Sequence, residues 1–274
     1  MSRVAAIQMA SGPNIGANLI EAERLIGLAV EKGADLVVMP ENFAIMGLDE
    51  EDKVRSCEQS GVGPIQEFIA RQAALHGVWI VAGTIPLRSG DPGKVFAACM
   101  LYDDSGECVA RYDKMHLFDV YIEANMESYT ESLTILPGKD VVVVDTPFGK
   151  IGLAVCYDLR FPELFRCMLD KGAEIFAIPS AFTAYTGKAH WESLVRVRAI
   201  ENLCYVIAPA QGGYHINGRE TFGDSMIVDP WGVVLDRMPT GAGVVCADID
   251  LEHLSGVRRG FPSISHRKLR IPGS

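Results

Sequence analysis

The chain has 274 residues, of which 49% are hydrophobic and 22% charged, as is usual for a globular protein with a buried core. Its formal net charge of −10 argues against nucleic acid as a partner, because a phosphate-binding surface needs an excess of basic residues. No apolar run approaches the roughly 20 residues of a membrane span, and the first residues lack the pattern of a secretion signal. We therefore expect a cytoplasmic protein with no membrane partner.

Strand-like and helix-like segments alternate along the chain. The predicted strands are residues 4–9, 36–39, 78–84, 95–102, 108–112, 141–145, 151–155, 175–178 and 204–208. The predicted helices are residues 18–31, 64–76, a segment starting at Pro162, and 189–202, while 113–139 is predicted to be irregular. Because no linker-like segment interrupts the alternation, we expect one α/β domain spanning 1–274.

An internal similarity relates residues 31–43 to residues 170–182. The two segments align without gaps and are identical at five of thirteen positions. Any helix–glycine–strand unit gives some similarity of this kind. The alternative is that the chain has two related halves whose sheets pack together between outer helix layers. Glu41 and Ser180 would then lie just beyond matching strands, at the carboxyl edge where α/β sheets bind ligands.

The seven cysteines are spread out, and none forms a C-x-x-C pair. Their odd number and spacing indicate neither a zinc site nor a disulfide framework, and we expect no metal. Cys156 stands apart, because it follows the short uncharged run 151–155 and precedes Pro162, which suits the first turn of a helix. The end of a buried strand is a good position for a nucleophile, although a small cysteine can also simply pack there.

A cysteine nucleophile needs help, because at neutral pH only a few per cent of ordinary thiols are ionised. Glu41 in MPENF is the candidate base, and its alternative role is to cap the following turn. Lys114 in RYDKMHLFD is the candidate cation. A lysine after a strand is usually solvated, but the apolar MHLF segment would draw this one inward.

The segments MPENF, YDKMHLFD and GLAVCYDLRFPEL, in this order, resemble the carbon–nitrogen hydrolase (nitrilase) superfamily. The resemblance extends over the whole chain, including PSAFTAYTGKAHWE and GRETFGDSMIVDPWG. It implies an α/β fold, a four-layer αββα sandwich with two pseudo-twofold related halves. It also implies Glu41 as general base, Lys114 as the cation that stabilises an oxyanion and Cys156 as nucleophile. Glu131 and Tyr157 would support them, unless Glu131 makes only a loop hydrogen bond.

The chemistry implied by the resemblance is hydrolysis of a small-molecule amide through a thioester, without a cofactor, in a homodimer or higher homo-oligomer. Arg160 is a candidate clamp for a substrate carboxylate, since a guanidinium fork suits that group. Its alternative is a salt bridge with Asp158 or Glu163. Further candidates for substrate binding are Ser180, Phe182 and His190. His190 and its neighbour Trp191, at a predicted helix start, could equally pack in the core or in an interface.

The finer pattern, including CYDLRFPEL and GRETFG, is most similar to the deaminated glutathione amidases of metabolite repair, which cleave a 2-oxoglutaramyl amide. The alternatives are an omega-amidase acting on 2-oxoglutaramate, a catalytically silent scaffold, and a thiol redox protein. The last is disfavoured because no resolving cysteine lies close to Cys156 in sequence.

Two positions depart from the family pattern. Asp113 stands where a basic residue usually precedes the lysine, and Asp224 stands where the sequence GHS is common. We expect them to influence Lys114 and the pocket rim.

Overall fold

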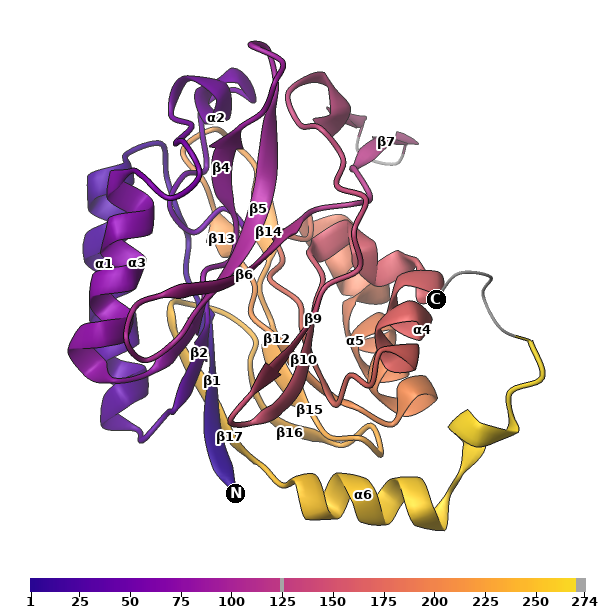
Figure 1. Cartoon of the computed structure of the whole chain (residues 1–274). Helices are drawn as coiled ribbons and strands as arrows, with labels where there is room; N and C mark the ends of the chain where they lie inside the picture. The colour runs from indigo at the N-terminus through magenta and orange to yellow at the C-terminus, as the bar shows by residue number, and fades with distance from the viewer. Residues whose placement is uncertain (124–125, 270–274) are drawn as a thin grey trace.

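The computed structural model of the protein describes residues 1–123 and 126–269. Two β-sheets pack face to face, and a pair of helices covers the outer face of each sheet (Figure 1). This arrangement confirms the predicted α/β fold with four layers in the order αββα. No helix in the described ranges is long and apolar enough to cross a membrane.

The first sheet comes mainly from the N-terminal half. Its strands, in spatial order, are β17 (Gly243–Ile249), β1 (Ser2–Gln8), β2 (Leu36–Val38), β3 (Trp79–Val81), β5 (Val95–Tyr102) and β4 (Ile85–Arg88), with β6 (Cys108–Asp113) also paired to β5. Its outer face is covered by α1 (Ile15–Glu31) and α3 (Pro64–His76), while α2 (Glu51–Arg55) lies near one end (Figure 1).

The second sheet comes from the C-terminal half. Its strands are β16 (Val234–Met238), β15 (Ser225–Val228), β12 (Tyr205–Ala208), β11 (Ile175–Ala177), β10 (Gly149–Leu153) and β9 (Val143–Thr146). It is covered by α4 (Pro162–Asp170) and α5 (Ala184–Asn202), and α6 (Leu251–Gly260) follows β17. Two hairpins complete the fold, β7 (Asp119–Ile122) with β8 (Glu127–Thr130) and β13 (Gly212–Tyr214) with β14 (Glu220–Phe222).

Burial of both sheet faces explains why the central strands are continuously apolar. In β1, Val4 and Ala6 belong to the core that contains Ile151 of the second sheet. Ala5, between them, belongs to the other core, together with Leu25 of α1. Because successive side chains of a strand point to opposite faces, one face of β1 meets the partner sheet and the other meets the helices.

The two sheets repeat the same central pattern. Strands β1, β2 and β3 are parallel, as are β10, β11 and β12, and each triplet continues into antiparallel neighbours. The similar segments 31–43 and 170–182 contain β2 and β11, the middle strands of these triplets. This equivalence supports the interpretation of two related halves.

Several local predictions need correction. Helix α5 begins at Ala184 and not at residue 189, because the Thr183 hydroxyl accepts a hydrogen bond from the Thr186 N–H and caps the helix. His190 and Trp191 therefore lie inside the helix. The stretch 113–139, predicted to be irregular, contains β7, β8 and the 3₁₀ turn η2 (Glu131–Leu133). Strands β4 and β13 to β17 and helices α2 and α6 were not predicted.

Gln211, which follows β12, joins the two halves. Its side chain is fully buried. Its Oε1 accepts a hydrogen bond from the Ser11 N–H at 2.9 Å, and its Nε2 donates to the Ser11 hydroxyl at 2.7 Å and to the Glu41 carbonyl at 3.0 Å. The backbone of Glu41, in the first half, is therefore held by a residue of the second half.

Candidate active site

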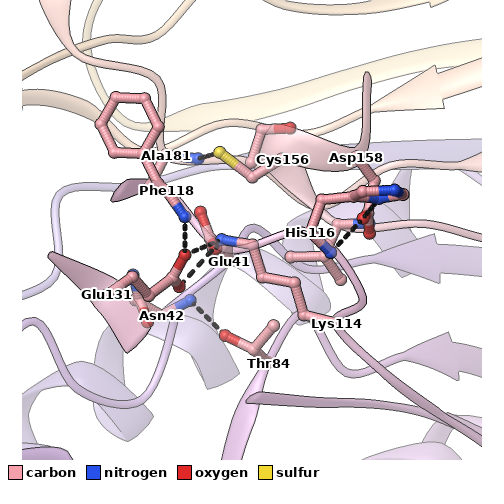
Figure 2. A network of polar contacts seen from close by, with 12 residues as sticks. Glu41, Asn42, Thr84, Lys114, His116, Phe118, Glu131, Cys156, Asp158 and Ala181 are labelled. Atoms are coloured by element: carbon pink, nitrogen blue, oxygen red, sulfur yellow. Dashed lines mark hydrogen bonds and ion pairs between the residues drawn. The ribbon is translucent and has the colours of Figure 1, made fainter. Parts of the chain in front are cut away.

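A buried ammonium group lies between two carboxylates beside Cys156 (Figure 2). The Lys114 Nζ is 2.8 Å from the Glu41 Oε1 and 2.9 and 2.8 Å from the Glu131 Oε1 and Oε2. Lys114 is only 2% exposed. The structure thus brings together the four residues for which the sequence predicts a role at the reacting centre.

Each of the three charged side chains is positioned by backbone contacts. Glu41 follows β2, and the next residue, Asn42, has a positive φ of 57° and donates its N–H to the Thr84 hydroxyl. Lys114 directly follows β6, and its N–H extends the sheet ladder by donating to the Ala97 carbonyl. Glu131 begins η2, and its Oε2 also accepts from the Phe118 N–H at 2.7 Å.

Cys156 lies in a strained turn that begins three residues after the end of β10. It begins the 3₁₀ turn η3 (Cys156–Arg160) with a φ of 49°, a left-handed conformation that a residue with a side chain rarely adopts. Its N–H donates to the Pro179 carbonyl at 2.9 Å, and the Ala181 N–H lies 3.5 Å from its Sγ. These contacts fix the thiol against the segment that follows β11.

The fully buried carboxylate of Asp158 fastens this turn to the segment that carries Lys114. Its Oδ2 accepts from the Val155 N–H at 2.8 Å and from the Tyr112 hydroxyl at 2.7 Å. Its Oδ1 accepts from the His116 N–H at 3.0 Å and lies 2.7 Å from the His116 Nδ1. The Asp158 carboxylate is therefore fully engaged by these groups. It does not form the salt bridge with Arg160 that was one alternative for the role of Arg160.

The electrostatics favour a neutral thiol beside a charged lysine. Burial raises the pKa of Cys156, and the neighbouring Glu41 carboxylate raises this pKa further, while Lys114 opposes the shift. Burial alone would lower the pKa of Lys114, but Glu131 and Glu41 outweigh it and keep this pKa well above the ordinary value for lysine. These shifts favour the protonated thiol, so a reaction at its sulfur would need a nearby base to take the proton.

A pocket with about 510 Å³ of empty space opens beside Cys156. Glu41, Lys114 and Glu131 also line it. The rest of its wall includes the aromatic rings of Phe118, Tyr129, Tyr157 and Phe182 and the cationic side chains of Lys53, Arg160 and Arg219. A concave site that combines aromatic rings with several convergent charged groups suits a small organic ligand that carries charge.

Arg160 reaches the pocket without a carboxylate partner among the described residues. Its guanidinium carbon lies 5.2 Å from the ring centre of Phe182 and 5.8 Å from that of Tyr157. Its Nη1 lies 3.2 Å from the Nδ1 of His190, which is exposed on α5 and does not line the pocket. Among the described residues, Arg160 forms no salt bridge with Asp158 or Glu163, which was its alternative role, so the guanidinium fork is available to a ligand.

Other predicted positions lie outside the pocket. Ser180 is fully buried and donates its hydroxyl to the Ile178 carbonyl at 3.0 Å, so its expected contact with substrate is not supported by its placement. Trp191 is buried in the core and donates its Nε1–H to the Asp224 carbonyl at 2.7 Å.

The two departures from the family pattern are both neutralised locally. Asp113 is paired with Arg111 at 2.8 Å, and Asp224 is paired with Arg237 at 2.5 Å. Neither carboxylate lines the pocket. The expectation that they influence Lys114 or the pocket rim is therefore not supported by any direct contact.

Sequence reasoning did not single out Arg219 or Lys53 as pocket residues. Arg219 belongs to the GRETFG segment, and Lys53 belongs to α2, which was not predicted. Arg219 could have been proposed as a pocket residue, because it is a basic residue within a segment that carries the family resemblance. Among the described residues, no group of three or more histidine, cysteine, aspartate or glutamate side chains is arranged to hold a metal ion.

The model of the carbon–nitrogen hydrolase family matches residues 3–259. The chain belongs to this family. It is 45% identical over 266 residues to the deaminated glutathione amidase of Synechocystis sp. strain PCC 6803, covering 96% of this chain and 97% of that protein. It is 40% identical over 275 residues to the human deaminated glutathione amidase, covering 99% of this chain and 84% of that protein.

Solved structures agree with the family assignment. Nit3 of Saccharomyces cerevisiae, a nitrilase superfamily member, superimposes with a TM-score of 0.87 at 29% identity, covering 98% of this chain and 97% of that one. The NitFhit protein of Caenorhabditis elegans superimposes with a TM-score of 0.89 at 36% identity, covering 97% of this chain. The present chain spans 65% of that longer protein. The protein is accordingly a hydrolase of carbon–nitrogen bonds.

Removal of the Glu41 carboxylate, which lies beside the Cys156 thiol, tests the electrostatics of the site. In Glu41→Gln, the pKa of Cys156 should fall, because the substitution removes the carboxylate that raises it. Modification of Cys156 by iodoacetamide, followed by mass spectrometry of its peptide, should then begin at lower pH than in the wild type. Glu67→Gln, a change at an exposed position of α3, is the control and should leave the profile unchanged. Coincident profiles of the wild type and Glu41→Gln would contradict this electrostatic account.

Proposed function

We propose that the protein hydrolyses the amide bond of deaminated glutathione, with Cys156 as nucleophile, Glu41 as general base and Lys114 as the oxyanion-stabilising cation. The observation that carries the proposal is the buried Glu41–Lys114–Glu131 cluster beside a neutral thiol, in a pocket that holds an arginine without a carboxylate partner. The name shared by relatives at 40–45% identity supports the choice of substrate.

In the first step, Glu41 takes the thiol proton while the sulfur attacks the amide carbon. The carbonyl oxygen becomes an oxyanion that faces the Lys114 ammonium and the Tyr157 N–H, which lies in the first turn of η3 where N–H groups lack an intrahelical acceptor. The total charge of the site is unchanged, because the carboxylate is neutralised as the oxyanion forms. A preorganised donor of this kind is typically worth about 3–4 kcal/mol of transition-state stabilisation.

In the second step, the protonated Glu41 gives its proton to the departing amine. The carbon–nitrogen bond breaks, cysteinylglycine leaves from deaminated glutathione, and a thioester to Cys156 remains. Glu41 then takes a proton from a water molecule that attacks the thioester, and 2-oxoglutarate leaves as the thiol is restored. The same sequence on 2-oxoglutaramate would release ammonia.

Glu131 and Arg160 supply the remaining roles in this proposal. Glu131 holds Lys114 through both carboxylate oxygens and keeps it charged, and it is itself fixed by the Phe118 N–H. Arg160 binds the carboxylate of the 2-oxo acid, and His190 supports it from α5. The aromatic rings of Tyr157 and Phe182 hold the guanidinium in place and close the pocket around the acyl chain.

A panel of amides tests the proposed activity. We expect the highest kcat/KM for deaminated glutathione, a lower value for 2-oxoglutaramate, and almost no hydrolysis of simple aliphatic amides or nitriles, measured as 2-oxoglutarate, acid or ammonia released. Cys156→Ala should abolish hydrolysis, because no thioester can form, and its circular dichroism should match that of the wild type. A tenth of the wild-type rate in Cys156→Ala would contradict the nucleophile. A preference for 2-oxoglutaramate would favour omega-amidase, and inactivity on the whole panel would favour a silent scaffold.

Substitution of the proposed clamp tests the recognition of the 2-oxo acid. Arg160→Met should raise KM steeply for both 2-oxo amides, since loss of one partner of a desolvated charge pair costs about 2–5 kcal/mol, a 30- to several-thousand-fold effect. Modification of Cys156 by iodoacetamide should stay close to the wild-type rate, because the thiol and its base are untouched. Wild-type kinetics in Arg160→Met would show that this side chain is only structural.

We also propose that the protein forms at least a homodimer through the surface around α5. This helix carries apolar side chains in contact with solvent, namely Tyr185, Val197 and Ile200, exposed at 52%, 38% and 44%. Burial of such side chains stabilises subunit association. Light scattering should therefore give a mass of at least twice the 29.8 kDa of one chain. A mass equal to one chain would contradict the proposal.

A cytoplasmic location belongs to the same proposal. The seven cysteines are all free thiols in the structure, as is common for proteins of a reducing compartment.

A further inference from the structure

A second cavity, here called the outer cavity, adjoins the inner pocket beside Cys156. This cavity has about 880 Å³ of empty space and shares four lining residues with the first, Glu50, Lys53, Tyr129 and Arg219. The shared residues mark the junction between the two cavities. Cys156 and Arg160 line only the inner one.

Arg219 is held rigidly at this junction. It precedes β14, donates from its Nη2 to the Ala181 carbonyl at 2.9 Å, and has its guanidinium carbon 5.1 Å from the ring centre of Tyr129. Its Nε is buried and makes no hydrogen bond within the described part of the chain. A fixed guanidinium with an unused buried donor is suited to a ligand with acceptor oxygens.

The acidic groups around this junction already have partners. The outer cavity is lined by three carboxylates, of which Glu50 pairs with Lys53 at 2.9 Å, Asp49 pairs with Arg55 at 2.8 Å, and Glu127 accepts from the Tyr129 hydroxyl at 2.9 Å. Arg219 has no ion-pair partner among the described residues. The junction therefore presents one guanidinium that is not neutralised by an ion pair, which favours an anionic ligand group.

We infer that Arg219 binds the carboxylate at the far end of the leaving group, which is the glycine carboxylate of deaminated glutathione. This inference rests on the proposed function. That substrate carries a carboxylate at each end, and among the described residues Arg160 and Arg219 are the arginines that line the inner pocket. The leaving group has two residues, and an extended dipeptide spans about 7 Å. Its carboxylate is thereby carried outward from the scissile nitrogen, toward the cavity that Arg219 borders.

Arg219 would thus determine specificity by distinguishing a peptide leaving group from ammonia. 2-Oxoglutaramate has the carboxylate for Arg160 but none for Arg219. A site whose donor is left without its partner loses transition-state stabilisation, and a hydrogen bond to a charged group is worth about 1.5–3 kcal/mol. The same pocket therefore favours deaminated glutathione over the smaller amide.

The test compares three substrates in four proteins. The substrates are deaminated glutathione, its C-terminal carboxamide and 2-oxoglutaramate. The proteins are the wild type, Arg219→Met, Arg219→Lys and the control Arg71→Met, which changes an arginine of α3 that also lies over an aromatic ring but outside both cavities. In Arg219→Met, kcat/KM for deaminated glutathione should fall about 10- to 150-fold, the equivalent of one charge-assisted hydrogen bond. The values for the carboxamide and 2-oxoglutaramate should stay within about threefold, which is below 1 kcal/mol.

Compared with Arg219→Met, Arg219→Lys should have a higher kcat/KM for deaminated glutathione but not for the other two substrates. The lysine restores the positive charge but not the two-pronged guanidinium geometry. Arg71→Met should match the wild type throughout. An equal loss on all three substrates would overturn the inference and show that Arg219 serves only to hold Ala181 near the thiol. Equal wild-type rates on deaminated glutathione and its carboxamide would also overturn it, yet leave the proposed function standing. If the wild type hydrolyses none of the three, the proposed function fails first, and the inference falls with it.

Discussion

The pairing of the Lys114 ammonium with two carboxylates is the interaction on which the rest of the site depends. A charge this deeply buried is costly unless it is paired and hydrogen-bonded, because it has lost its hydration. Glu41 and Glu131 supply three close oxygen contacts. These partners come from the end of β2 and from η2, so the ammonium is stable only when the first sheet and the segment following β8 are both in place. Removal of Lys114 would leave the two carboxylates side by side without a counter-charge.

The geometry around Cys156 depends on contacts that cross between the two halves. Cys156 adopts a strained backbone conformation in the second half, and Asp158 ties its turn to the lysine segment of the first half. Gln211 ties the backbone of Glu41 to the second half in the same way. Glu41, Lys114 and the Cys156 thiol are thus held relative to one another by two buried polar side chains. Under the proposed function, Asp158 and Gln211 are positioning residues.

Much of this arrangement could be predicted from local sequence. The apolar runs before Glu41 and Cys156 identify buried strands, and the similarity of 31–43 to 170–182 indicates that both positions lie at matching strand ends. The apolar residues after Lys114 correctly suggested its burial. The same reasoning placed Ser180 correctly beyond β11, but sequence equivalence with Glu41 does not reveal which way a side chain turns. The Ser180 hydroxyl bonds to the backbone two residues earlier.

Contacts between segments that are distant in sequence could not be predicted from local sequence patterns. Asp158 was considered as a partner for its neighbour Arg160, whereas its actual partners Tyr112 and His116 lie more than 40 residues away in sequence. Arg219 reaches the pocket from the segment before β14, which carries no local catalytic signal. The raised pKa of Cys156 also follows from this long-range packing. Because a raised pKa favours the protonated thiol, we expect its alkylation and oxidation to be slow. Under the proposed function, the sulfur becomes a strong nucleophile only when a bound carbonyl can accept the negative charge beside Lys114, so the burial that suppresses its general reactivity also makes it selective for substrate.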